Sequence, residues 1–246
     1  IVTTAYLRRM LSFLKGLYAA SPDASFTLPK TEKAFFDEIL KIYSGTAPEN
    51  TNNDTARAQF TRACGVAFEK ERKAFYKDPS LLTKTTSIKK DELLAAIDVF
   101  MSHLEYSIKA NKKDNGLFHS YNILGIGKDT MKVSYLQEML EGQVSILSSG
   151  ILNAEESLEL LQKMKASKLY EERQKSYMLY PNKNLKTFLE KNNISAEDAK
   201  ALETVVAKTG NAFIEKDENN VYHFNAEFRN AGVMMEHAAA LPLAKK

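Results

Sequence analysis

The sequence predicts a mainly α-helical protein of stacked antiparallel helical hairpins, similar to part of an (α/α) toroid, with a small β-hairpin near the C-terminus. Three observations predict it. Long stretches carry apolar residues at helical spacing, polar connections between them are short, and 246 residues include only 10 Gly and 6 Pro. So few helix-breaking residues argue against a β-protein with many turns. The 44% hydrophobic and 26% charged residues exclude a disordered or fibrous chain.

Three helices are expected in the first third of the chain. Apolar stripes predict helices that end at residues 21–23, at Gly45 and at 78–79. Asn53 or Asp54 is the candidate N-cap of the third helix, because their side chains accept hydrogen bonds from free backbone N–H groups. These segments form the first hairpins of the predicted stack.

Three further helices are expected in the middle of the chain. Residues 91–110 carry the widest apolar stripe. A helix over 131–148 should end at Gly150, where glycine suits a helix C-terminus. Asn153 and Glu156 have the spacing of a capping box and should open the next helix.

The C-terminal part combines helices with short extended segments. Residues 177–181 are predicted to be extended, and a helix is expected over 195–208. Alternation over 221–224 predicts a strand that pairs with 211–216 in a hairpin, and a last helix should cover 227–240.

The chain is expected to form a single helical domain over residues 1–246, as a segment of a longer protein. It begins with Ile1 rather than Met, and no strong compositional boundary divides it. Residues 77–90 are the candidate sub-boundary. The remainder of the longer polypeptide is therefore the expected partner.

Composition also excludes several classes of function. The net charge of +3 gives no basic stripe for nucleic acid, and no apolar run approaches a membrane span of about 18 residues. The single Cys64 excludes an internal disulfide framework. With no signal peptide at the N-terminus, we expect a cytoplasmic protein. No metal-ligand spacing is present, so neither a metal nor another cofactor is predicted.

Chemistry-bearing residues concentrate between residues 114 and 150, where five of the ten glycines lie. After the Asp-Asn-Gly turn at 114–116, an extended segment would place His119 and Tyr121 on one face and Asn122 on the other. Imidazole, phenol and amide groups can bind a small polar ligand. The alternative is a satisfied histidine and a half-buried tyrosine near a helix end.

Glu138 and Glu141 are the candidate catalytic pair. At i and i+3 of the predicted helix they share a face, and two carboxylates can divide acid and base roles. Glu141 is the stronger candidate, since Gly142 and Gln143 follow it. The alternative is a pair of solvated glutamates on an amphipathic helix.

A third polar cluster lies near the C-terminus. It contains His223, Asn225 and Arg229. An arginine beside amides can clamp a carboxylate or phosphate, particularly at a helix N-terminus. The alternative is a helix cap with a surface ion pair.

Residues 93–180 resemble parts of the six-hairpin (α/α) toroid carbohydrate-active enzymes. The resemblance lies in the helix ending at Asn111, the turn at 114–119, the helix at 138–150 and the helix start at 151–156. It covers about a third of the chain. A complete ring needs about twelve helices, more than this chain offers, and Tyr and Phe would replace the Trp that usually stacks on sugars.

The resemblance implies a helical part of a larger glycoside hydrolase or phosphorylase. Glu141 would be an acid or base, and His119, Tyr121, Asn122 and Gln143 would bind sugar hydroxyls. One alternative is a non-catalytic helical lobe of a large metabolic enzyme, for example a pyrophosphate-type phosphoenolpyruvate carboxykinase. Another is a helical protein-interaction module.

Overall fold

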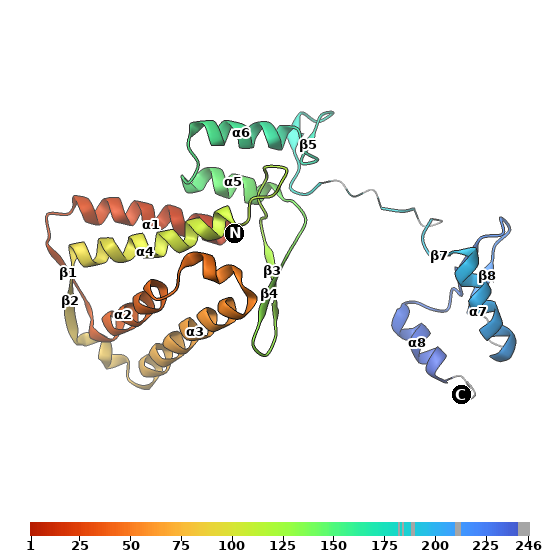
Figure 1. Cartoon of the computed structure of the whole chain (residues 1–246), viewed down its shortest axis with the longest axis horizontal. Helices are drawn as coiled ribbons and strands as arrows, with labels where there is room; N and C mark the ends of the chain where they lie inside the picture. Colours follow the sequence, from red (N-terminus) through yellow and green to blue (C-terminus); the bar gives the residue numbers. More distant parts are fainter. Residues whose placement is uncertain (182, 184, 188–189, 210–212, 241–246) are drawn as a thin grey trace. The chain divides into compact units, whose positions relative to one another are not determined.

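A computed structural model describes residues 1–181, 183, 185–187, 190–209 and 213–240, apart from the side chains of 205–206 and 208–209. The chain divides into two compact units, residues 1–182 and 183–246, and each is described by itself. The described residues form helices α1–α8 and small antiparallel sheets (Figure 1). This confirms the predicted mainly α fold. The candidate sub-boundary at 77–90 lies inside the first unit.

Helix α1 (Val2–Ala20) lies alongside α4 (Lys90–Lys109) and also packs on α5 (Leu140–Ser149) (Figure 1). Ala5 is fully buried, and its small side chain lets the helices approach closely. Arg8 of α1 donates from Nε to Glu105 of α4 at 3.0 Å and from a guanidinium nitrogen to the Ser149 carbonyl at 2.7 Å. One side chain therefore joins three helices.

Helices α2 (Lys30–Ser44) and α3 (Asp54–Lys77) form the next hairpin, connected through the 3₁₀ helix η1 (Pro48–Asn52). The Asn53 side chain accepts hydrogen bonds from two backbone N–H groups of the first turn of α3, which confirms it as the N-cap. Tyr43 contacts Phe60 and Phe100 edge-to-face, at centroid distances of 4.9 and 5.0 Å. These rings hold α2, α3 and α4 together.

A two-stranded sheet connects α1, α2 and α4, since β1 lies between α1 and α2 and β2 directly precedes α4. Strand β1 (Ser25–Pro29) pairs antiparallel with β2 (Thr85–Lys89), which follows the 3₁₀ helix η2 (Pro79–Thr83). Phe26 stands opposite the buried Ile88. The backbone pairing ties residues 77–90 into the first unit.

The predicted helix over 131–148 is wrong in its first half. Residues Met131–Tyr135 form strand β4, which pairs antiparallel with β3 (Asn122–Ile126), and α5 begins only at Leu140. A tight turn joins the two strands through a hydrogen bond from the Gly127 N–H to the Thr130 carbonyl. Once this turn closes, the neighbouring strand supplies the backbone hydrogen bonds that a helix would otherwise supply.

The main core of the first unit lies among α1, α4, α5 and α6 (Ala154–Lys165). Its buried members are Ala5, Ile108, Leu117, Phe118, Ile146, Leu160, Met164 and Leu169. The capping box that opens α6 is confirmed, since Asn153 and Glu156 exchange backbone and side-chain hydrogen bonds at 2.8 and 2.9 Å. A short hairpin of β5 (Tyr170–Glu171) and β6 (Ser176–Tyr177) follows.

The described residues of the second unit combine two helices with a three-stranded sheet. Strands β7 (Asn193–Ile194), β9 (Tyr222–Phe224) and β8 (Ile214–Lys216) lie in that order. The pairing of β8 with β9 confirms the predicted hairpin, although residues 211–212 of its first strand lie outside the described residues. Helix α7 (Ala196–Thr209) begins after Ser195, as expected.

The last helix begins later than predicted. Helix α8 covers Ala231–Ala240, whereas a start at residue 227 was expected. The Asn225 side chain accepts from the Glu227 N–H at 2.9 Å, and the Asn230 side chain accepts from the Val233 N–H at 3.0 Å. Asn225 and Asn230 thus each cap a turn, and α8 begins after Asn230. None of the helices within the described ranges is long and apolar enough to cross a bilayer.

Candidate functional site

The polar segments 114–122 and 138–143 lie against each other, and one buried side chain joins them. Gln143 of α5 is fully buried. Its Oε1 accepts from the Phe118 N–H at 2.8 Å, and its Nε2 donates to the carbonyls of Phe118 at 2.7 Å and of Met139 at 3.1 Å. Gln143 therefore clamps the loop to α5, and its amide is fully used by the backbone.

A glycine allows the two segments to approach so closely. A Cβ atom on Gly142 would lie 2.2 Å from the Oγ of Ser120 and 3.0 Å from its Cα. Ser120 is buried and donates to the Met139 carbonyl at 3.2 Å. The glycine at this position therefore reflects the close packing of the α5 backbone on Ser120.

The loop between α4 and β3 is itself a tight turn. Gly116 has a φ of +85°, the Lys113 N–H donates to the Leu117 carbonyl at 2.8 Å, and the His119 N–H donates to the Asn111 carbonyl at 3.0 Å. The side chains of Asn111 and Asn122 bind each other at 2.9 Å. Local hydrogen bonds thus fix the backbone that carries the predicted ligand residues.

Glu138 and Glu141 do not share a helix face, which corrects that expectation. Glu138 precedes α5 and accepts hydrogen bonds from Lys113 and, at 2.8 Å, from Asn115. Burial alone would raise the pKa of Glu138, but the hydrogen bonds from Lys113 and Asn115 outweigh it and lower the pKa. Glu138 is therefore held as a charged carboxylate that anchors the loop.

Glu141 lies in the first turn of α5 and is exposed. Its Oε2 accepts from the Tyr121 hydroxyl at 2.6 Å, and this hydrogen bond raises the pKa of Tyr121. The pair borders a cavity of about 370 Å³, here named the outer pocket. The outer pocket is lined by Val2, Tyr6, Tyr121, Leu140, Glu141, Val144 and Leu179.

The side chain of His119 contacts Tyr135 rather than Tyr121 or Glu141. Its ring stacks on Tyr135 at a centroid distance of 3.9 Å and an angle of 11°. Burial, followed by the charge of Lys113, lowers the pKa of His119, so the ring is neutral at neutral pH. The two rings line a separate cavity of about 440 Å³. His119 and Tyr121 therefore face different pockets.

Aromatic and amide side chains line a further cavity, and most of its residues were not among the predicted site residues. This cavity, here named the inner pocket, measures about 460 Å³ and includes residues of α2, η1, α3, α4 and β4. Tyr121, Asn122 and Tyr135 also line it, so it adjoins the predicted site. The sequence could not predict this pocket, because its lining residues come from elements that are far apart along the chain.

The third predicted cluster lies in the second unit, where His223 and Asn225 bind groups close to them in the sequence. The Nε2 of His223 lies 3.1 Å from a carboxylate oxygen of Asp217, and Asn225 caps the following turn. Arg229 follows that turn, before α8 begins. Within the described part of the chain, no group of three His, Cys, Asp or Glu side chains could hold a metal ion.

Comparison with known proteins finds one family model. Residues 185–246 match the GH149 phosphorylase insertion domain 2, which is 62 of the 246 residues. No curated protein matches the chain. The match supports the expected relation to carbohydrate-active enzymes, and an insertion domain implies a longer polypeptide. It includes His223, Asn225 and Arg229, whereas residues 114–143 lie outside it.

Proposed function

We propose that this chain is a helical accessory part of a longer carbohydrate phosphorylase-like enzyme, and that its first unit binds a glycan in the outer pocket. The family match at residues 185–246 supports the class of enzyme. The outer pocket supports the ligand class, because it combines exposed aromatic rings with a carboxylate. The six-hairpin ring implied by residues 93–180 would be completed by the rest of the polypeptide.

The outer pocket offers two kinds of contact to a sugar. The side chains of Tyr6 and Tyr121 are 47% and 39% exposed, so their rings can pack against the apolar face of a sugar ring. Glu141 uses one oxygen for the Tyr121 hydroxyl, and the other can accept hydrogen bonds from sugar hydroxyls. Such a mixture of apolar wall and few polar groups is typical of ligand sites.

The arrangement favours binding over bond cleavage on this chain. Glycoside hydrolysis uses two carboxyl groups that flank the bond, one of them an acid with a raised pKa. Glu138 instead has a lowered pKa and binds Lys113 and Asn115. We therefore assign Glu141 to sugar binding and the chemistry to the remainder of the enzyme.

The Tyr121–Glu141 hydrogen bond beside Tyr6 is the observation that carries this proposal. Isothermal titration with neutral oligosaccharides should show saturable binding to the full-length protein. Tyr6→Ala and Glu141→Gln should each weaken it about tenfold or more. Tyr76→Ala is the matched control, since Tyr76 is a 72% exposed tyrosine on α3. Equal affinities in Tyr6→Ala and wild type would disprove the proposed site.

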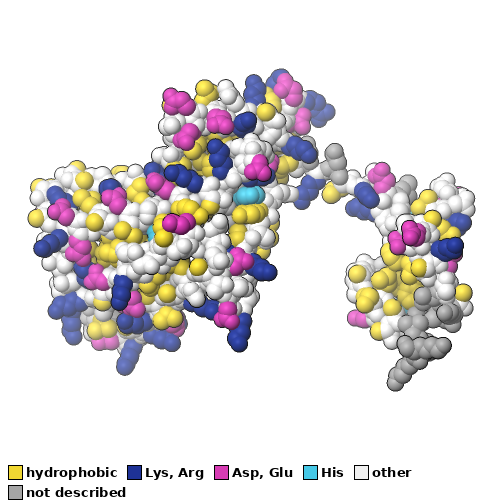
Figure 2. Space-filling view, in the orientation of Figure 1, with side chains coloured by type: hydrophobic (Ala, Val, Ile, Leu, Met, Phe, Trp, Pro, Cys, Tyr) yellow, Lys and Arg dark blue, Asp and Glu magenta, His cyan; other side chains and the backbone are white. Residues whose placement is uncertain are grey.

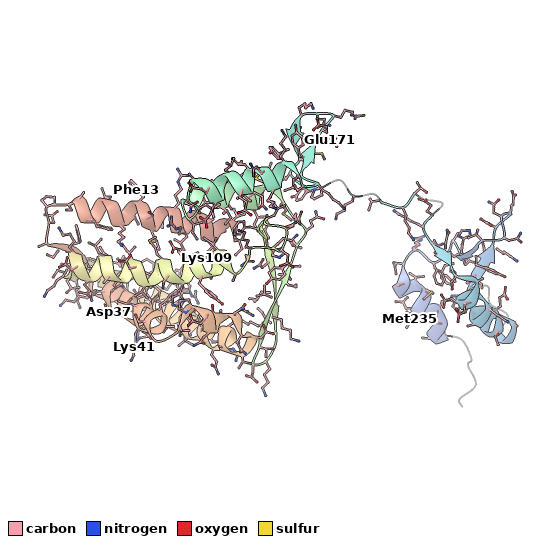
Figure 3. All side chains as sticks on the ribbon, turned by 45° about the horizontal axis from the view of Figure 1, so that its top comes forward. Phe13, Asp37, Lys41, Lys109, Glu171 and Met235 are labelled. Carbon is pink, nitrogen blue, oxygen red and sulfur yellow. The ribbon has the colours of Figure 1, made fainter. Side chains whose placement is uncertain are left out.

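A second function, packing of this lobe on the rest of the enzyme, is favoured by one face of α1. Met10, Phe13 and Leu17 recur at helical spacing and are 50% or more exposed. Phe13, labelled in Figure 3, is 68% exposed. Charged side chains of both signs lie between the hydrophobic ones on the face shown in Figure 2. An apolar stripe of this kind is typical of a surface that another domain covers.

This packing function predicts a stability effect in the longer polypeptide. Phe13→Glu should lower its melting temperature by several degrees, because a charge would be buried against the partner domain. Val66→Glu is the matched control, since Val66 on α3 is also 68% exposed. Equal melting temperatures for both variants would show that the α1 stripe faces solvent.

A further inference from the structure

The inner pocket lies where the α2–α3 hairpin, α4 and β4 meet, and aromatic side chains build its walls. His103 of α4 stacks on Phe60 of α3 at a centroid distance of 5.7 Å and an angle of 7°. Tyr43 of α2 contacts His103 edge-to-face at 4.8 Å, and its backbone carbonyl lies 3.0 Å from the Nε2 of His103. Three helices thus hold these rings in fixed positions before any ligand binds.

Hydroxyl groups at this pocket are left free for a ligand. The hydroxyls of Tyr43 and Tyr106 make no hydrogen bond to another described residue, and neither oxygen is sealed away from solvent. Both side chains are only partly exposed. Each hydroxyl can donate one hydrogen bond and accept others, so the pair matches the hydroxyl groups of a polyol.

The charges around the pocket argue for an uncharged ligand. Arg57 is the one Lys, Arg, Asp or Glu side chain among the described lining residues. Its guanidinium already donates to Asp54 at 2.8 Å, to the Asn52 carbonyl at 2.9 Å and to the Met131 carbonyl. The Ile1 amino group also lines the pocket and donates to the Ser120 carbonyl at 2.9 Å, so each cation that a phosphate or carboxylate would meet here already has a protein partner.

We propose that the inner pocket binds one uncharged sugar unit, which a sugar phosphate cannot replace. The partly exposed ring of Phe60, held in place by the buried His103, packs against the sugar ring, and the hydroxyls of Tyr43 and Tyr106 bind its hydroxyls. The volume of about 460 Å³ lies within the range of small-molecule sites. This inference rests on the proposed function for the carbohydrate class of the ligand.

The position of Tyr121 links the two pockets. Tyr121 lines both the inner and the outer pocket. A glycan in the outer pocket and a sugar unit in the inner pocket would therefore both contact Tyr121.

Saturation-transfer NMR on the full-length protein tests the inference with glucose, galactose, mannose and glucose 1-phosphate. At least one neutral hexose should bind, and glucose 1-phosphate should bind at least tenfold more weakly. Tyr106→Phe should weaken hexose binding about tenfold, because it removes one hydroxyl and keeps the ring. Tyr76→Phe is the matched control and should bind as wild type does. Thr61→Tyr places a large side chain at an exposed edge of the pocket and should block binding.

The two sites can be separated by their variants. Tyr6→Ala should weaken oligosaccharide binding and leave hexose binding unchanged. If Tyr106→Phe and Thr61→Tyr bind hexose as wild type does while Tyr6→Ala loses oligosaccharide binding, the inner site is wrong and the outer site stands. Hexose binding lost in Tyr106→Phe, with oligosaccharide binding intact in Tyr6→Ala, supports the inner site and removes the outer one. Equal or tighter binding of glucose 1-phosphate would overturn the inference of a neutral ligand.

Discussion

Replacement of Gln143 by alanine should destabilise the first unit more than replacement of any exposed polar residue. The buried amide makes three hydrogen bonds, to the N–H and carbonyl of Phe118 and to the carbonyl of Met139. Each contributes about 0.5–1.5 kcal/mol net, and a buried backbone group left unpaired costs about 1–3 kcal/mol. Phe118 is only 3% exposed, so water reaches its backbone poorly. We expect a loss of about 3–5 kcal/mol.

Two measurements test this value. Urea denaturation followed by far-UV circular dichroism gives the free energy of unfolding. Native-state hydrogen exchange reads the two units separately, and protection should fall in the first unit alone. Gln162→Ala is the matched control, because Gln162 is exposed on α6 and alanine favours a helix. A loss below about 1 kcal/mol in Gln143→Ala would refute the clamp.

Two further changes test the packing and the charges around the same loop. Gly142→Ala should destabilise the chain by about 2–3 kcal/mol, because the added Cβ would collide with Ser120. In the control Gly65→Ala, in α3, the added Cβ meets no atom within 4 Å and should stabilise the chain by about 0.5–1 kcal/mol. Thermal unfolding compares the two variants, and equal effects would contradict the close approach of Gly142 to Ser120. The lowered pKa of Glu138 stabilises the fold above its ordinary pKa of 4.5, and this contribution is lost as pH falls through the lowered folded value. Glu138→Gln should remove that part of the acid dependence, as measured by urea unfolding from pH 7 to pH 3, and an unchanged pH profile would show that the ion pair with Lys113 contributes nothing.

Most helix boundaries could be predicted because their signals are local. Asn53 caps α3 through N–H groups two and three residues away, and Asn153 and Glu156 cap each other across three residues. Residues 131–135 alternate apolar and polar side chains as a strand does, but the apolar residues after them continue at helical spacing into α5, so the sequence carried signals for both a strand and a helix. The partner strand β3 decides between them by supplying the hydrogen bonds.

The sequence indicated which two segments carry the polar residues of the candidate site, but not which groups each side chain contacts. The turn at 114–116 and the glycines marked the region that the structure brings together with α5. From the sequence, Gln143 was predicted to bind a ligand and Glu138 to be a catalytic residue. In the structure both side chains hold the loop in place, Gln143 by binding Phe118 and Glu138 by binding Lys113. Each of these contacts spans 25 residues, so no local pattern predicts it.

The sequence by itself determined most helix ends, such as the starts of α3 and α6, because caps and apolar stripes act between residues within about four positions. Only the tertiary structure decided which side chains are structural and where the pockets lie. Tyr43 and His103 meet across 60 residues, and Tyr121 meets Glu141 across 20. Contacts of this range depend on how whole helices pack, which no local pattern encodes.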